Sequence, residues 1–184
     1  MPSKPKPKLG LLDLLDNAII SIGNAASWLI AVLIVAILVQ VVLRYLFHRS
    51  YVVLEELQWH LYAIIIMLGL SYAFVKDSHI RLDIMHTRFS KPTKEKIEII
   101  GIVFLLWPMI FVFFMHGLDF VGESFRVGEC SDAPSGLSYR WLIKSVIPIA
   151  FFLMFCASVS RLIRAVSYLK NRNKEIPGKS SDGC

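Results

Sequence analysis

The sequence predicts an all-α integral membrane protein with four transmembrane helices, both termini in the cytoplasm and a possible N-terminal interfacial amphipathic helix. Three observations lead to this prediction. Of 184 residues, 55% are hydrophobic and 18% are charged, with a mean hydropathy of +0.59, whereas ordinary soluble domains carry about 25% charged residues. Four apolar runs are long enough to cross the roughly 30 Å hydrocarbon core of a bilayer as helices. Basic residues gather in alternate segments between those runs.

The four apolar runs define a membrane domain between two polar ends. The first run, from Asn17 to Leu43, contains no charged residue. The second and third each contain one histidine, His60 and His116, and the fourth has Lys144 near its start. We expect an N-terminal arm at 1–16, a membrane domain at 17–160 with spans at about 19–43, 57–75, 99–118 and 141–160, and a basic cytoplasmic tail at 161–184.

The distribution of basic residues predicts the orientation of the spans. Fifteen Lys and Arg residues fall in the N-terminal arm, the loop between the second and third spans and the tail, and five fall in the other two loops. Short loops rich in Lys and Arg stay on the cytoplasmic side of a membrane. Both termini are therefore expected in the cytoplasm. The net charge of +6 suits contact with anionic lipid headgroups, and we expect no nucleic-acid partner.

The segment before the first span has an amphipathic pattern. In "GLLDLLDNAIISIG" the apolar side chains gather on one face, and Asp13, Asp16 and Asn17 lie on the other. Two interpretations stay open: a helix that lies flat at the cytoplasmic surface, or one long tilted helix that continues into the first span. The apolar stretch is too long for the central region of a cleavable signal peptide, so we expect the segment to be retained.

Residues that commonly carry chemistry are scarce. Cys130, Cys156 and Cys184 are expected at different depths, so they predict no disulfide framework. No Asp or Glu falls near the middle of a span, although an independent proton-coupled exporter would need such a carboxylate. His79 and His86 are seven residues apart in a loop, and no recurring ligand spacing around them indicates a metal site. We expect no enzymatic activity, no cofactor and no metal.

A small haem-binding redox protein remains an alternative. His60 and His116 both fall near the outer ends of their spans, where they could approach each other. A haem that carries electrons across the bilayer would need a histidine pair nearer the middle. The alternative predicts a coloured protein with a Soret band, and a colourless preparation would exclude it.

Small and polar residues inside the spans indicate helix packing. Small residues recur at every fourth position, where another backbone can approach closely. These residues are Gly23, Ser27 and Ala31 in the first span and Gly69 and Ala73 in the second. Gln40 lies inside the first span, and we expect its amide to bond to another helix or to a backbone carbonyl. Pro108 and Pro148 are expected to bend the third and fourth spans.

Several short motifs together resemble a known family. "VVLRYLFHRS" closes the first span, "EELQWHLYAIIIMLGLSYAF" forms the second and "KDSHIRLDI" follows it. This order of motifs is similar to that of the small membrane subunit, the DctQ-like or Q-type subunit, of tripartite ATP-independent periplasmic (TRAP) transporters. The matching positions are Arg44 and Tyr45, Glu55 and Glu56, Gly69, and His79, Ile80 and Asp83.

The resemblance implies a partner rather than a reaction. In such transporters a periplasmic binding protein captures an organic acid, and a large membrane subunit moves it inward by an elevator-like motion driven by a sodium gradient. The small subunit is expected to be a fixed scaffold for the large one in the inner membrane, and to meet the binding protein only transiently. A general membrane adaptor is a further alternative, which differs only in its partner.

Candidate interface residues cluster at the ends of the spans. Arg44 ends the first span and Glu55 and Glu56 open the second, so we expect a hairpin that brings opposite charges together. These residues are expected to pin the hairpin, or one carboxylate is expected to face a partner. At the inner end, the residues expected to hold the loop against headgroups or the large subunit are His79, Arg81 and Asp83. A second candidate docking surface is the acidic outer segment with Asp119, Glu123, Glu129 and Asp132.

Overall fold

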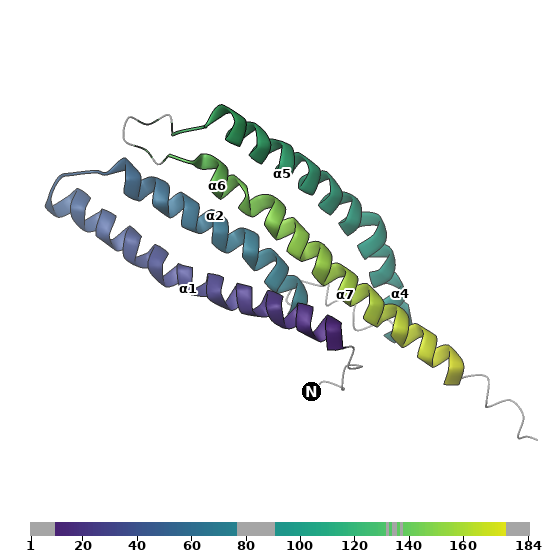
Figure 1. Ribbon diagram of the computed structural model, residues 1–184. Helices are drawn as coiled ribbons and strands as arrows, with labels where there is room; N and C mark the ends of the chain where they lie inside the picture. Colours follow the sequence, from purple (N-terminus) through teal and green to yellow (C-terminus); the bar gives the residue numbers. More distant parts are fainter. Residues whose placement is uncertain (1–9, 77–90, 132, 134–135, 137, 176–184) are drawn as a thin grey trace, which may run out of the picture.

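The chain folds into long helices, as the sequence predicts. The computed structural model describes residues 10–76, 91–131, 133, 136 and 138–175 (Figure 1). Its elements are α1 (Gly10–Leu46), α2 (Val52–Val75), α4 (Lys91–Gly101), the π-helical η1 (Ile102–Leu106), α5 (Trp107–Val127), α6 (Arg140–Lys144) and α7 (Val146–Glu175). Four stretches are long and apolar enough to cross a membrane: Leu12–Leu46, Val52–Val75, Pro92–Val127 and Arg140–Asn171.

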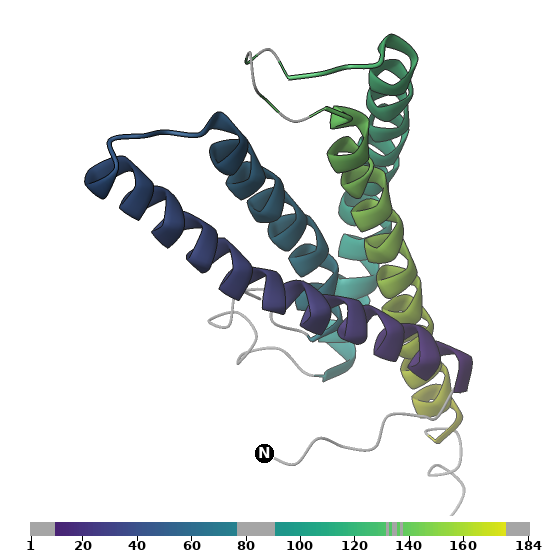
Figure 2. The same cartoon turned by 60° about the vertical axis from the view of Figure 1, so that its left-hand side comes forward.

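The helices form two hairpins that diverge at one end. In Figure 1 the order across the molecule is α1, α2, α7 and α5. Figure 2 shows the α1 and α2 hairpin leaning away from α5, α6 and α7 at the end where α1 joins α2, and meeting them at the opposite end. Helix α7 contacts α2, α5, α4 and α1, so it is the central element that joins the two hairpins.

Helix α1 is continuous from its amphipathic start into the first span. At about 1.5 Å per residue its 37 residues are about 55 Å long, which exceeds the roughly 30 Å core and requires tilt or an end outside the core. In its first half the buried residues Leu12, Ile19, Gly23 and Ala26 are spaced by seven, four and three positions, which places them on one face. Leu12 and Ile19 of the predicted apolar face are buried, whereas Leu15 and Ile22 are exposed. A position of the first turns flat on the membrane surface stays a prediction.

Only part of the expected small-residue pattern lies inside the molecule. Gly23 is buried, and a methyl group added there would come within 2.6 Å of Cβ and Cγ of Tyr72 on α2. Ser27 and Ala31 are exposed, although they share the four-residue spacing. Gly69 has open space around the position of a Cβ atom. Of these positions, Gly23 is therefore the one where α1 and α2 approach each other closely.

Polar side chains inside the bundle bond from helix to helix. The Gln58 amide of α2 donates to Gln40 Oε1 and, at 3.2 Å, to the carbonyl oxygen of Ala36 on α1. This contact confirms the predicted role of Gln40. The Ser71 hydroxyl of α2 donates to the Ala150 carbonyl of α7 at 2.9 Å. The apolar cluster of Ile110, Phe151 and Met154 packs helices against each other. Hydrogen bonds between helices also matter in a membrane, because apolar side chains contact lipid as favourably as they contact another helix.

Breaks in the regular hydrogen-bond pattern lie beside both intramembrane prolines. Pro108 has no N–H to donate, and in η1, just before it, the Trp107 N–H bonds to Ile102 O, five residues back. The α4 to α5 stretch curves at this place in Figure 1. Pro148 follows Ser145, where α6 ends before α7 begins at Val146. The prolines therefore accompany irregular helix geometry, as their chemistry requires.

The Gly23 contact predicts an asymmetric effect of two identical substitutions. Gly23→Ala places a methyl group against Tyr72 Cβ and Cγ, and overpacking of this kind typically costs about 1–3 kcal/mol. Gly69→Ala, with open space, is the matched control and should not destabilise the protein. The thermal unfolding midpoint in detergent, followed by tryptophan fluorescence, should fall only for Gly23→Ala. Equal midpoints for the two variants would contradict this packing of α1 on α2.

Candidate functional site

An open groove separates α1 from α2 near the hairpin turn. We call it the α1–α2 groove; it has a volume of about 580 Å³ and apolar walls that include Leu33, Ile37 and Val41 of α1. Arg44, Tyr45, Glu55, Trp59 and Tyr62 also line it. The Gln40 and Gln58 pair joins its two walls. The groove combines an apolar surface with polar and charged groups from both helices.

The local sequence explains why Arg44 and Glu55 reach the same groove. His48 adopts a left-handed conformation, with φ of 50°, and the Arg49 N–H bonds back to Leu43 O at 3.1 Å; both are typical of a helix C-terminus. Helix α2 then begins at Val52, with Glu55 in its first turn, where a carboxylate interacts favourably with the helix dipole. A short turn therefore places the two charged residues near each other.

The two predicted hairpin charges do not form an ion pair with each other. Within the described residues, no ion pair joins Arg44 to Glu55, although both line the α1–α2 groove. Glu56 instead accepts a hydrogen bond from the Ser131 hydroxyl in the segment between α5 and α6. The two adjacent carboxylates thus face different surroundings, and the role of Arg44 as a pin for the hairpin stays a prediction.

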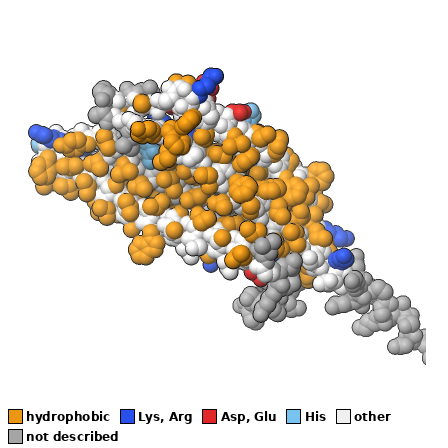
Figure 3. Space-filling view, in the orientation of Figure 1, with side chains coloured by type: hydrophobic (Ala, Val, Ile, Leu, Met, Phe, Trp, Pro, Cys, Tyr) orange, Lys and Arg blue, Asp and Glu red, His pale blue; other side chains and the backbone are white. Residues whose placement is uncertain are grey.

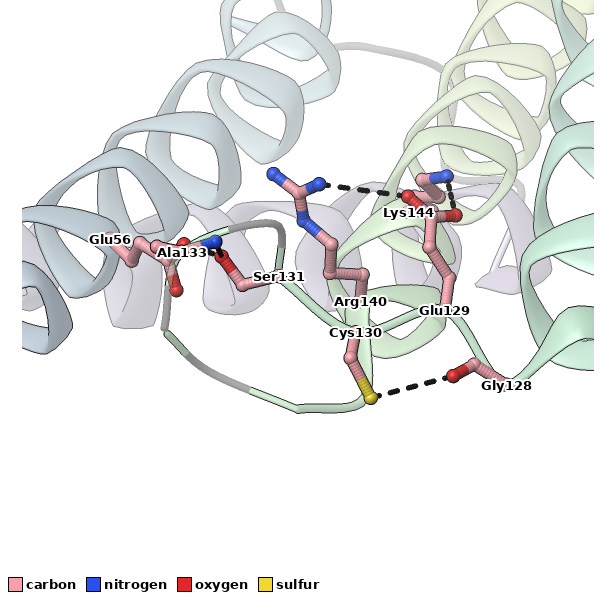
Figure 4. A network of polar contacts seen from close by, with 8 residues as sticks. All are labelled: Glu56, Gly128, Glu129, Cys130, Ser131, Ala133, Arg140 and Lys144. Carbon is pink, nitrogen blue, oxygen red and sulfur yellow. Dashed lines mark hydrogen bonds and ion pairs between the residues drawn. The ribbon is translucent and has the colours of Figure 1, made fainter. Parts of the chain in front are cut away.

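A polar network at the end where α1 joins α2 connects the two hairpins (Figure 4). Helix α5 ends at Val127 and is followed by Gly128, whose φ is 62°. The Glu129 N–H bonds to Ser124 O at 3.0 Å, a common helix-terminating motif. This turn directs Glu129 toward α6, where its carboxylate pairs with Lys144 and lies 3.7 Å from an Arg140 nitrogen. With the Ser131 to Glu56 bond, the network ties the α5–α6 segment to α2.

The cations around Glu129 change its acidity. The hydrogen bond from Lys144, together with the positive charges of Lys144 and Arg140, holds the pKa of Glu129 below its ordinary value of 4.5. Lys144 also lies 3.9 Å from the centre of the Phe120 ring, a distance that permits a cation–π interaction. The predicted acidic docking segment is therefore partly neutralised within the chain at Glu129; Asp132 lies outside the described residues.

A second ionic cluster joins the opposite ends of the helices, and sequence reasoning missed it. The Arg164 guanidinium of α7 bonds to Asp13 at 2.7 Å and to Asp16 at 2.8 Å, both on the first turns of α1. The side chain of Arg164 is only 7% exposed, and its Nε and Nη1 atoms have no hydrogen-bond partner within the described part of the chain. The acidic face of the amphipathic start was the available signal, but its partner is about 150 residues away.

The neighbouring arginine makes a parallel contact to another helix. Arg161 bonds to both carboxylate oxygens of Glu98 at 2.6 Å and lies 3.6 Å from Glu95, both on α4. Such two-pronged bonds fix geometry as well as charge. Arg161 and Arg164 therefore tie α7 to α4 and α1 at the end where the two hairpins meet.

The histidines of the redox alternative occupy different surroundings. His60 lines a cavity of about 420 Å³ together with Trp59, Phe120 and Lys144, and its Nδ1 atom is 2.5 Å from the Glu56 carbonyl oxygen. His116 is exposed on α5 and does not line this cavity. Within the described residues, no group of three or more His, Cys, Asp or Glu side chains could hold a metal ion.

The predicted contacts of the loop after α2 involve residues that the structure does not describe. His79, Arg81, Asp83 and His86 lie outside the described residues. Their expected contact with headgroups or with a larger subunit stays a prediction.

The lowered pKa of Glu129 predicts how its contribution to stability varies with pH. Because the folded-state pKa is below the ordinary value of 4.5, the stabilisation is present above that pH and is lost as the pH falls through the folded-state value. Thermal unfolding midpoints of wild type and Glu129→Gln should differ at pH 7 and converge as the pH falls through the lowered folded-state pKa. Glu123→Gln, in an exposed pair with Arg126, is the control. A constant difference for Glu129→Gln across this range would contradict the assignment.

The burial of Arg164 predicts a large effect of removing its charge. Arg164→Met leaves Asp16, 16% exposed, without its cation, and breaking a buried pair costs about 3–5 kcal/mol. Arg126→Met, in the exposed pair, should change stability by less than about 1 kcal/mol. Adding Asp13→Asn and Asp16→Asn to Arg164→Met should restore part of the loss, measured by thermal unfolding. No recovery in the triple variant would show that the loss does not arise from the unpaired carboxylates.

Comparisons with known proteins identify the family of this chain. The family model described as "Tripartite ATP-independent periplasmic transporters, DctQ component" matches residues 33–167. The "Sialic acid TRAP transporter permease protein SiaT" of Haemophilus influenzae (strain 86-028NP) is 30% identical over 139 residues, which cover 73% of this chain but only 22% of that relative. The match confirms the resemblance seen in the motifs. The chain belongs to the DctQ-component family of TRAP transporters, as a multi-pass inner-membrane protein.

Proposed function

We propose that this chain is the small permease subunit that braces a large, elevator-type subunit during sodium-driven uptake of an organic acid. The observation that carries the proposal is the family match across residues 33–167. The substrate would be delivered by a periplasmic binding protein that meets the complex transiently. The match covers only 22% of that relative, and we place substrate transport in the large permease subunit.

The charge distribution supports a bracing role. From residue 17 to residue 43, from 57 to 75 and from 99 to 118, the sequence has no Asp, Glu, Lys or Arg. Ionisable groups at the middle of the membrane usually mark ion and proton pathways. On the face drawn in Figure 3, hydrophobic side chains cover the middle, and charged ones lie toward the ends and one edge. The chain therefore has the surface of a membrane-embedded support.

The ionic contacts at both ends support a rigid body. The polar network around Glu129 and Ser131 ties the α5–α6 segment to α2. Arg161 and Arg164 tie α7 to α4 and α1. A helix bundle fixed at both ends can resist the movement of a neighbouring transport domain. The excess of basic residues in alternate segments supports an orientation with both termini in the cytoplasm.

The name of the relative suggests the first substrate to examine. That protein is described as a sialic acid permease, and sialic acid is a carboxylate. We propose an organic acid as the substrate class, with sialic acid tested first and dicarboxylates and other sugar acids next.

Reconstitution tests the proposed function. Liposomes that contain only this chain should take up no labelled organic acid, because it has no central ionisable site. Liposomes with this chain, its large permease and the matching binding protein should show uptake that depends on a sodium gradient. Omitting this chain is the matched control and should abolish that uptake. Transport by this chain alone, or full uptake without it, would contradict the proposal.

A further inference from the structure

The α1–α2 groove presents polar groups that nothing in the described chain satisfies. Trp59 and Tyr62 are 68% and 53% exposed, and both line the groove with Arg44, Tyr45 and Glu55. Within the described residues, none of these five side chains makes a hydrogen bond or an ion pair. The groove therefore offers one cation, one anion and three polar-tipped aromatic rings to a partner outside the chain.

These side chains lie on both walls of the groove and at different positions along the helix axes. Tyr62 follows Glu55 by seven residues on α2, which is about 10 Å along a helix axis. A hydroxyl without a hydrogen bond is costly in hydrocarbon. Trp59 and Tyr45 suit the membrane interface, but Tyr62 lies well below the level of the charged residues.

We propose that the α1–α2 groove receives a transmembrane helix of the large permease. That helix would carry a carboxylate opposite Arg44, a basic or hydrogen-bond-donating side chain opposite Glu55, and oxygen acceptors within reach of Trp59 and Tyr62. This inference rests on the proposed function. It assigns the contact with the large subunit to one surface and states the chemistry of the partner.

A helix fits the groove better than a phospholipid does. A lipid headgroup brings its charges to one depth, and below it the acyl chains offer no acceptor for Tyr62. A helix presents side chains at every turn, about 5.4 Å apart, so it can meet Arg44 and Tyr62 together. Trp, Tyr and Arg are also the residues that most often dominate protein interfaces.

The outer face of the other hairpin provides a contrast. Phe104, Leu105 and Phe111 on η1 and α5 are strongly exposed, and their side chains have no polar atom to satisfy. Such a surface is well suited to lipid. Phe111 is therefore a control position, aromatic and exposed like Tyr62 but on a different hairpin.

Site-specific photocrosslinking tests the inference in the intact complex. The photoreactive amino acid p-benzoylphenylalanine replaces Tyr62, Trp59 or, as control, Phe111 in cells that also produce the large permease. Irradiation should yield a product from Tyr62 and Trp59 whose peptides, identified by mass spectrometry, come from this chain and the large permease. Phe111 should yield no such product. All three positions are exposed aromatic residues, so each variant should fold, and co-purification of both chains before irradiation verifies it.

The results that would contradict the groove contact differ from those that would contradict the proposed function. An intact complex that gives permease adducts only from Phe111, or none from either groove position, would overturn the inference while the proposed function stands. Phospholipid adducts alone from Tyr62 would assign the groove to lipid and overturn it as well. Failure of the wild-type chains to co-purify would instead contradict the proposed function.

Charge reversal gives an independent measure of the same contact. Arg44→Glu would place like charges together in the assembled groove and should reduce the amount of co-purified permease at least about tenfold, the change that 1.4 kcal/mol produces. Arg126→Glu reverses an exposed charge on α5 and should leave recovery unchanged. Equal recovery for both variants would exclude Arg44 from the interface.

Discussion

The lack of hydrogen-bond partners in the bilayer core is the constraint on which this structure depends. A polar group in hydrocarbon needs a partner within the protein, and several polar side chains of the described spans find one on a neighbouring helix. Gln58 bonds to Gln40 and to a backbone carbonyl, and Ser71 bonds to a carbonyl of α7. The charged groups are left to the ends of the helices, where they form ionic networks.

Those terminal networks explain the shape of the molecule. At the end where the hairpins meet, Arg161 and Arg164 of α7 hold α4 and α1 against α7. At the other end the hairpins diverge (Figure 2), and the α5–α6 segment reaches back to Glu56 on α2. The molecule is thus joined at both ends although its helices diverge, and this arrangement leaves broad apolar surfaces for lipid and for a neighbouring protein.

Features that depend on local sequence could be predicted from the sequence. Features that depend on which face each helix turns toward its neighbours could not. Continuous apolar runs indicate spanning helices directly, and Pro108 marks an irregular helix because proline lacks an N–H. The pairing of Arg164 with Asp13 and Asp16 depends on which faces of α1 and α7 meet, and no local pattern determines that. The same limit explains why Gly23 is buried and Ser27, four residues later, is exposed. The adjacent residues Glu55 and Glu56 face different surroundings because a helix turns by about 100° per residue.

The central claim is that this chain is a rigid support whose two hairpins keep a fixed separation while its partner transports substrate. Spin labels at Ser50→Cys and Gly122→Cys, with the three native cysteines replaced, would report the distance between the hairpins by pulsed electron paramagnetic resonance. In the complete transporter, the account predicts one distance distribution that is unchanged by sodium, substrate and binding protein. A distribution that shifts or splits when these are added would contradict it, because the hairpins would then take part in the movement.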